Sequence, residues 1–154
     1  MHAILAAVDF SDITEDVCHA ATELARRLGA RIWVVHVAPP DPDFVGWEPG
    51  PPSVRVTVAN ELRREHRKVQ QLAAAMRREG ITATGLLVQG PTVGTILHEA
   101  EARDAELIVM GAHGHGALHM ALTGSIAAGV LKRATCPVLV VPAASHATLE
   151  MAFA

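Results

Sequence analysis

The stretch Gly111–Ser125, which reads GAHGHGALHMALTGS, joins two segments of different character. The apolar run before it, Leu107–Met110, predicts a buried strand, and a helical pattern begins at Ser125–Ile126. Because glycine has no Cβ, a loop of this composition can turn its backbone N–H groups inward around an anion. The helix that follows adds unpaired N–H groups and the positive end of its dipole. The stretch therefore predicts a phosphate-binding loop between a strand and a helix.

Short apolar runs and helical patterns alternate along the chain. The runs predict strands at Ala3–Val8, Arg31–Val37, Ile81–Val88, Glu106–Met110 and Val138–Val141. The first helical pattern predicts a helix that Ser11 or Asp12 can cap and that Gly29 ends. Further helices are predicted at Val54–Gly80, after Thr92 and at Ser125–Arg133. Continuously apolar strands, each followed by a helix, indicate an α/β fold: an open, doubly wound parallel sheet with helices on both faces. Ligands of such sheets bind beyond the carboxyl ends of the strands, where Asp9 and the glycine-rich loop lie.

The segments outside this alternation are few. We expect residues 1–142 to form a single domain, because the chain shows neither an internal repeat nor a second pattern. Residues 39–53 are rich in proline and predict a surface loop. Residues 143–154 have no periodicity and predict a loose C-terminal tail.

The composition excludes several classes of protein. The chain has 154 residues, is 50% hydrophobic and has a net charge of −3 when histidine is neutral. Its basic residues are spread out, which argues against nucleic acid as a partner. Cys18 and Cys136 are expected to be buried free thiols of a reducing compartment rather than a disulfide. The first apolar run lacks a basic segment before it, and no run is long enough to cross a bilayer, so we expect a cytoplasmic protein without a membrane partner.

The glycine-rich stretch has a defined spacing: Gly111, two residues, Gly114, nine residues, Gly124 and then Ser125. This Gly-x2-Gly-x9-Gly-Ser spacing resembles the nucleotide-binding motif of the universal stress protein family. The resemblance covers nearly the whole chain, because matching segments also occur at Val8–Ser11, His36–Val37, Gly90–Pro91 and Cys136–Val141.

The resemblance implies a fold, a ligand and a set of contacts. The fold would be a five-stranded sheet in the order 3-2-1-4-5, similar to that of adenine nucleotide alpha hydrolase-like proteins. Members with this glycine pattern bind ATP, and Mg²⁺ would be held by the ATP phosphates and water rather than by side chains. The residues implied at the adenosine end are Ala7, Val8, Asp9 and Val37, with Met110 beside them in the core or against the nucleotide. The residues implied at the phosphates are Gly111, Gly114, Gly124 and Ser125, together with the backbone N–H of Ile126.

Two of these residues have more than one interpretation. Asp9 suits the hydroxyl and amino donors of adenosine, but it can also cap the first helix or accept turn N–H groups. Gly124 is expected to be glycine because a Cβ would meet a phosphate or because the backbone angles require it. Both alternatives depend on geometry that the sequence does not give.

The loop lacks the residues of better-known phosphate sites. No lysine follows a glycine anywhere in the chain, and the first strand ends in Asp9 rather than in a Gly-x-Gly-x-x-Gly turn. We therefore expect the loop to bind ATP rather than to hydrolyse it. His113, His115 and His119 lie in the loop without a Cys, Asp or Glu, so we expect phosphate or solvent contacts rather than a metal site.

Three classes of function remain open. The first is an ATP-binding regulatory protein of the stress response that acts through its liganded state and a homodimer. The second is a slow ATPase or nucleotidyl-transfer enzyme, and the third is a dimeric interaction module with a vestigial pocket. The resemblance implies a dimer through antiparallel pairing of Val138–Val141 with a second copy, unless Pro142 and the tail shield that edge.

Overall fold

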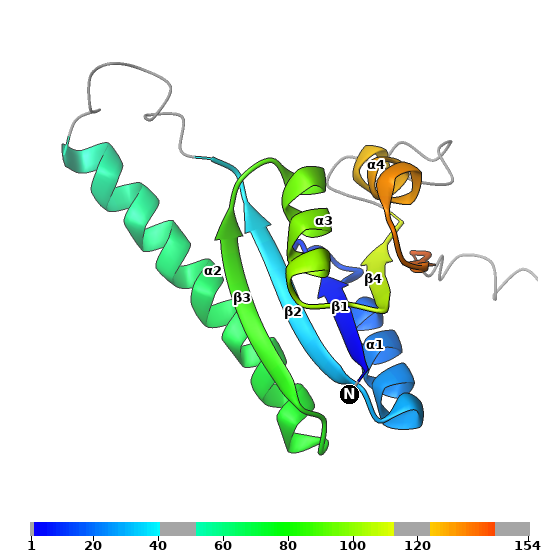
Figure 1. Cartoon of the computed structure of the whole chain (residues 1–154). Helices are drawn as coiled ribbons and strands as arrows, with labels where there is room; N and C mark the ends of the chain where they lie inside the picture. Colours follow the sequence, from blue (N-terminus) through cyan, green and yellow to red (C-terminus); the bar gives the residue numbers. More distant parts are fainter. Residues whose placement is uncertain (1, 41–51, 113–123, 144–154) are drawn as a thin grey trace, which may run out of the picture.

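The computed structural model describes residues 2–40, 52–112 and 124–143, and in them strands and helices alternate along the chain (Figure 1). The expected surface loop and tail therefore lie mostly outside the described residues. The strands are β1 (Ala3–Ala7), β2 (Arg31–Ala38), β3 (Ala83–Gln89), β4 (Leu107–Gly111) and β5 (Val138–Val141). The helices are α1 (Thr14–Leu28), α2 (Pro52–Arg78), α3 (Thr92–Ala102) and α4 (Ser125–Arg133). No helix in these ranges is long and apolar enough to cross a membrane.

The strands form one parallel sheet in the order β3-β2-β1-β4-β5, which confirms the expected topology. Strand β1 lies at the centre, with Ala7 opposite Val35 of β2 and Met110 of β4. From β1 the chain runs first to one side, through β2 and β3, and then returns to the other side, through β4 and β5. The strand order therefore reverses between β1 and β4, where an open parallel sheet leaves a crevice at its carboxyl edge.

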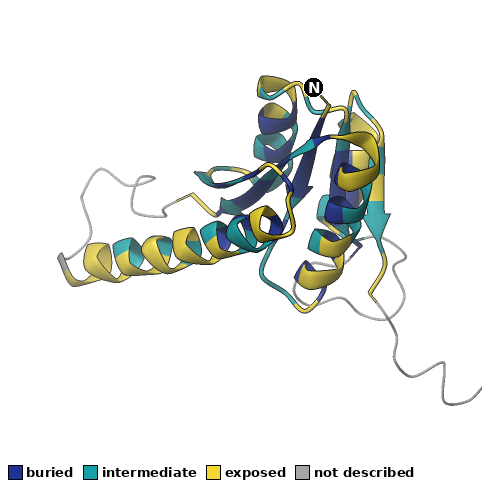
Figure 2. Ribbon diagram, turned by 90° about the horizontal axis from the view of Figure 1, so that it is seen from below, coloured by how far each residue is buried: buried dark blue, intermediate teal, exposed yellow. Residues whose placement is uncertain are grey.

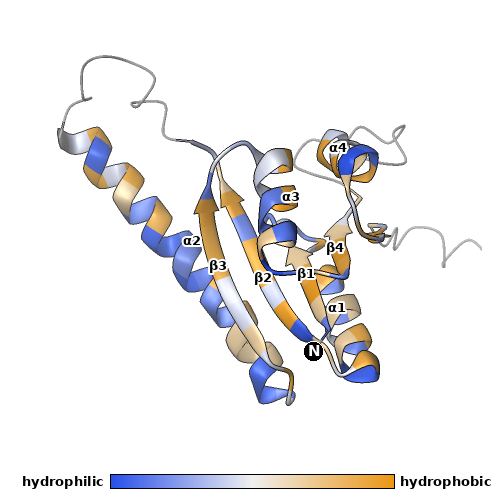
Figure 3. Ribbon diagram, viewed as in Figure 1, coloured by the Kyte–Doolittle hydropathy of each residue, from blue (hydrophilic) through white to orange (hydrophobic). Residues whose placement is uncertain are grey.

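The helices cover both faces of the sheet and bury two apolar clusters. Helices α1 and α2 pack on one face, and α3 and α4 pack on the other (Figure 1). Because side chains alternate along a strand, neighbouring residues join different clusters: Ile4, Val34 and Val109 face α1 and α2, whereas Leu5 and Val35 face α3 and α4. The strands accordingly appear as the most apolar part of the molecule in Figure 3.

The start of α1 differs from the expectation. Neither Ser11 nor Asp12 caps the helix, because the N-cap position is Ile13 and no side chain there bonds to the first turn. The Ser11 side chain is instead used in a turn with Asp9, as described below. The expected end is confirmed, since Gly29 follows Leu28 in the left-handed region with φ of 64°.

Other boundaries move by one or two residues. Strand β1 ends at Ala7 and β3 begins at Ala83. The Val8 N–H still donates to the Val35 carbonyl oxygen of β2, whereas the Ile81 N–H donates to the Met76 carbonyl oxygen at the end of α2. Strand β4 extends to Gly111, so the first glycine of the loop belongs to the sheet. Helix α2 begins at Pro52, where the fixed φ of proline suits the first turn.

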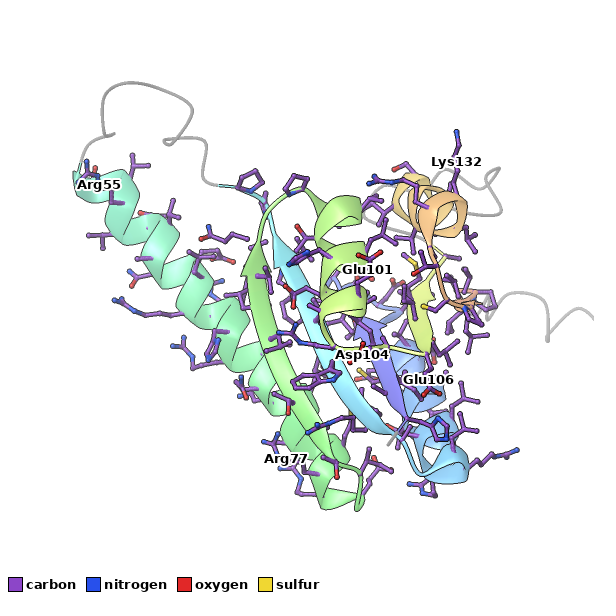
Figure 4. The ribbon with its side chains drawn as sticks, viewed as in Figure 1. Arg55, Arg77, Glu101, Asp104, Glu106 and Lys132 are labelled. Atoms are coloured by element: carbon purple, nitrogen blue, oxygen red, sulfur yellow. The ribbon has the colours of Figure 1, made fainter. Side chains whose placement is uncertain are left out.

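Helix α2 is longer than the strands that it covers. Its 27 residues span about 40 Å, whereas the 7 residues of β3 span about 23 Å. The C-terminal half is buried on the sheet through Val69, Ala73 and Met76, and the N-terminal half projects beyond it (Figure 2). Arg55 marks the projecting end, far from Arg77 at the other end of the helix (Figure 4). Val58 and Leu62, two apolar residues of this half, are therefore only half-buried.

Gly85 lets α2 approach β3 closely. A Cβ at this position would lie 2.6 Å from the Val69 carbonyl oxygen and 2.9 Å from its carbonyl carbon. The Gln70 side-chain amide also donates to the Gly85 carbonyl oxygen across 2.9 Å. The close passage of the α2 backbone therefore explains why a glycine occupies the middle of this strand.

Candidate functional site

A pocket lies at the carboxyl edge of the sheet, where the strand order reverses. Its empty volume is about 580 Å³, open solvent at its mouth included. The ends of β1, β2 and β4 form its floor, and the first turns of α1, α3 and α4 form its walls. The crevice position expected from the sheet order is therefore occupied by a real cavity.

Most of the pocket wall is apolar. The residues expected at the site that line it are Ala7, Val8, Asp9, Val37, Met110, Gly111 and Ile126. Further lining residues, which the sequence interpretation did not name, are Ile13, Thr14, Val17, Val35, Thr92, Ile96, Ala112 and Ala127. An apolar slot with a few polar groups at defined places is the usual character of a small-molecule site.

Asp9 supplies the negative charge of the pocket. Its Oδ1 accepts hydrogen bonds from the Ser11 backbone N–H at 3.0 Å and from the Ser11 hydroxyl at 2.5 Å. The alternative that Asp9 satisfies turn N–H groups is therefore confirmed for this oxygen. Because both bonds use Oδ1, neither of them occupies the second carboxylate oxygen, which can accept from another donor.

Thr14 is a second polar group of the pocket, in the first turn of α1. The residue is only 7% exposed, and within the described residues its hydroxyl makes no hydrogen bond. A buried hydroxyl without a partner carries a desolvation cost unless water or a ligand bonds to it. The sequence interpretation did not find Thr14, although its place in the first turn of a helix that begins shortly after Asp9 was a signal that could have found it.

The expected phosphate end lies between β4 and α4. The Gly124 N–H donates to the Ala112 carbonyl oxygen and so holds the start of α4 beside the end of β4. Gly124 is the N-cap of α4 with φ of −60° and ψ of 161°, which any residue adopts. The expectation that its backbone angles require glycine is therefore wrong, and the alternative that a Cβ would meet a phosphate stays a prediction.

The remaining loop residues are not brought into the pocket wall. Ser125 is exposed at the first position of α4, and neither it nor Gly124 lines the cavity. Gly114 lies outside the described residues, as do His113, His115 and His119. In the described ranges no group of three or more His, Cys, Asp or Glu side chains is placed to hold a metal ion.

The cysteines offer no reactive thiolate. Both are free and partly buried, which agrees with the expectation. Burial of Cys18, with the Glu15 carboxylate adding to it, raises the pKa of its thiol to about 11. Burial also raises the pKa of the Cys136 thiol. Since the thiolate is the nucleophile, neither residue is suited to covalent catalysis at neutral pH.

The comparison with known proteins agrees with this geometry. The model of the universal stress protein family matches residues 1–142. The chain belongs to that family. A universal stress protein of Thermus aquaticus is 35% identical over 144 residues, which cover 90% of this chain and 96% of the relative. The solved structure of the protein MJ0577 superimposes with a TM-score of 0.76 and 25% identity, covering 92% of this chain and 96% of that one.

Two other universal stress protein structures contain adenine nucleotides. The Archaeoglobus fulgidus protein in complex with dAMP has a TM-score of 0.62 at 24% identity, and covers 91% of this chain and 96% of its own. A universal stress protein in complex with cAMP has a TM-score of 0.63 at 20% identity, and covers 92% of this chain and 96% of its own. At these identities the comparison establishes the shared fold, and both ligands have adenine in common.

Proposed function

We propose that this universal stress protein binds ATP in the pocket between β1 and β4 and acts as a nucleotide-dependent regulatory protein of the stress response. The observation that carries the proposal is an apolar pocket at the reversal of the strand order with the Asp9 carboxylate at its wall. The adenine nucleotides bound by two relatives of the same fold support the choice of ligand.

The residues present fit an adenosine group. Aliphatic side chains such as Val37, Ile96 and Ile126 offer a surface on which a purine can pack. The free oxygen of Asp9 can accept from ribose hydroxyls or from the adenine amino group, and the Thr14 hydroxyl can serve either as donor or as acceptor. These two groups would orient the nucleoside at the β1 side of the pocket.

The phosphates would extend toward the start of α4. Backbone N–H groups at a helix N-terminus carry partial positive charge, and the N-cap of α4 is Gly124, which places no side chain beside them. The Ser125 hydroxyl and the Ile126 N–H are the donors that we assign to the phosphates. Mg²⁺ would be held by phosphate oxygens and water, where it neutralises part of the phosphate charge.

The ligand that remains on the protein after purification tests the proposal directly. Denaturing the purified protein should release its ligand, and mass spectrometry should identify that ligand as ATP. Release of ADP or AMP, formed on the protein, would favour a slow ATPase or nucleotidyl-transfer enzyme. If the pocket is empty and also takes up no added adenine nucleotide, the remaining function is that of a dimeric interaction module whose pocket is vestigial.

Replacing Asp9 should weaken adenosine and ATP to a similar degree, because its assigned contact lies away from the phosphates. Asp9→Ala should reduce both affinities by roughly tenfold, the loss expected for one hydrogen bond to a charged acceptor. Calorimetric titration of both ligands measures the effect. Asp9→Asn retains an oxygen for the Ser11 turn while it removes the charge, and Asp12→Ala is the control at an exposed position outside the pocket. Unchanged affinities in Asp9→Ala would remove Asp9 from the site.

We also propose a homodimer through the edge strand β5. The strand has no partner on one side within the described residues, and Leu139 is 37% exposed on it. An apolar edge strand exposes unpaired N–H and C=O groups, and these favour pairing with a strand of another chain. Antiparallel pairing with β5 of a second copy would satisfy its free N–H and C=O groups and bury Leu139.

Leu139→Lys should disrupt this dimer. A charged side chain at the centre of an apolar contact should raise the dimer dissociation constant by at least about tenfold. Because Leu139 is exposed in the single chain, this variant disturbs the fold less than a change at the half-buried Val140. Light scattering at micromolar concentration gives the readout, and Leu28→Lys, at a 53% exposed position on α1, is the matched control. A wild-type chain that is already monomeric would contradict the proposal.

A further inference from the structure

His36 of β2 lies directly behind the turn that carries Asp9. Its neighbours Val35 and Val37 line the pocket, and alternation along the strand places His36 on the opposite face, toward α1 and α2. The residue is 7% exposed and is absent from the pocket wall. Buried histidines are uncommon without polar partners, so its contacts need an explanation.

The first contact holds the residue before Asp9. His36 Nδ1 lies 2.9 Å from the carbonyl oxygen of Val8. A carbonyl oxygen can only accept, so Nδ1 carries the hydrogen and donates it. The Val8 N–H in turn donates to the Val35 carbonyl oxygen across 2.9 Å. The backbone of Val8 is therefore tied to β2 through both its N–H and its C=O.

The second contact holds the residue after Asp9. Phe10 has φ of 59°, a left-handed conformation that bulky residues rarely adopt. Its ring packs on the His36 ring, with centroids 4.2 Å apart and planes inclined by 34°. Lys68 of α2 places its Nζ 5.2 Å from the centroid of the same Phe10 ring. A strained backbone persists only where its surroundings hold it, and His36 is one of the groups that hold this one.

The third contact braces the histidine itself. His36 Nε2 lies 3.5 Å from Oε2 of Glu65, a residue of α2, and the two side chains are 10% and 19% exposed. Within the described residues Nε2 makes no hydrogen bond. Because a carboxylate oxygen only accepts and Nδ1 already donates to Val8, Nε2 can bond to Glu65 only when the ring carries a hydrogen on both nitrogens. A glutamine at position 65 could accept from that N–H through its amide oxygen, or donate an amide hydrogen to a bare Nε2, and so keep the ring in place.

We propose that His36, braced by Glu65, is a positioning residue for Asp9. By fixing Val8 and Phe10 it fixes the backbone between them, and with it the direction in which the Asp9 carboxylate faces the pocket. Nucleotide affinity would then depend on two residues outside the pocket wall, the buried His36 and the half-buried Glu65. This inference rests on the ATP site proposed above.

The test is a double-mutant cycle between His36 and Asp9. His36→Phe keeps an aromatic ring against Phe10 but removes the donor to Val8. It should weaken binding of adenosine and of ATP by roughly tenfold, the effect of losing one well-placed hydrogen bond and the geometry that it maintains. In an Asp9→Ala background the same change should have no further effect on affinity, because a positioning residue acts only through the group that it positions.

Two further variants separate positioning from general destabilisation. Met76→Ala removes a 2% exposed side chain at the C-terminal end of α2 and should lower the melting temperature while nucleotide affinity stays unchanged. Glu65→Ala should weaken both ligands in the same way as His36→Phe, and Glu65→Gln should restore the affinity. The Glu65 pair gives the answer even if His36→Phe does not fold.

The outcomes distinguish this inference from the function on which it rests. If the wild-type protein binds neither adenosine nor ATP, the proposed function fails and the inference fails with it. If the wild type binds and Asp9→Ala weakens binding, but His36→Phe and Glu65→Ala bind as the wild type does, only the inference is overturned. Losses at His36 and Asp9 that add fully in the double variant would also overturn it, since His36 would then act independently of Asp9.

Discussion

Replacing Gly124 by valine is expected to weaken ATP binding by about a hundredfold and to change adenosine binding by less than about twofold. The start of α4 is held at the end of β4 by the bond from the Gly124 N–H to the Ala112 carbonyl oxygen, so moving the backbone away from a bulky side chain would break that bond. A branched side chain would occupy the space assigned to the phosphates and break at least one charge-assisted hydrogen bond, each of which contributes roughly 1.5–3 kcal/mol. Because φ of Gly124 is −60°, valine adds no backbone strain that could confuse the result.

Calorimetric titration with both ligands measures this difference, and circular dichroism establishes that the fold is retained. Ala128→Val is the matched control, because it adds a branched side chain at an exposed position of the same helix. Ser125→Ala should have the milder effect on ATP, since it removes one hydroxyl without filling any space. ATP binding at the wild-type level by a folded Gly124→Val variant would mean that the loop is only a turn.

Replacing Gly85 by alanine is expected to lower the free energy of unfolding by about 2–3 kcal/mol, at the upper end of the range for overpacking a core. The added Cβ would lie 2.6 Å from the Val69 carbonyl oxygen, and this neighbour is helix backbone rather than a flexible side chain. Helix α2 would have to shift away from β3, with loss of the Gln70 hydrogen bond to Gly85. Denaturant unfolding with an unchanged slope measures the loss.

Gly94 of α3 offers the same substitution with the opposite expected sign. Apart from its chain neighbours and the backbone of its own helix, no described heavy atom lies within 4 Å of a Cβ built at this position. Alanine in an open helix position should raise the free energy of unfolding by roughly 0.5–1 kcal/mol, because glycine loses more backbone entropy on folding. If Gly85→Ala also left the free energy of unfolding unchanged or raised it, the explanation of Gly85 by the close approach of α2 to β3 would be contradicted.

The alternation of apolar runs and helical patterns was sufficient to predict the elements and the class of fold. The runs that became β1 and β4 are apolar throughout, because both of their faces are covered by helices. Gly29 and Gly80 end their helices with φ of 64° and 84°, conformations that a glycine adopts without strain. The strand order came from the family resemblance, and the structure confirms it. The elements and their ends depend on local sequence, so periodicity and turn chemistry are enough to find them, whereas the strand order needed the resemblance.

The tertiary structure decided which residues meet. It gave one oxygen of Asp9 to Ser11, placed the Thr14 hydroxyl in the pocket, and explained Gly85 by the passage of α2. It also brought His36 against Val8 and Phe10, which are separated from it by all of α1. Periodicity along a chain says which face of an element is buried, but not which atoms of a distant element will lie against that face. That choice depends on how the helices and strands pack together, and it exists only once the sheet has formed.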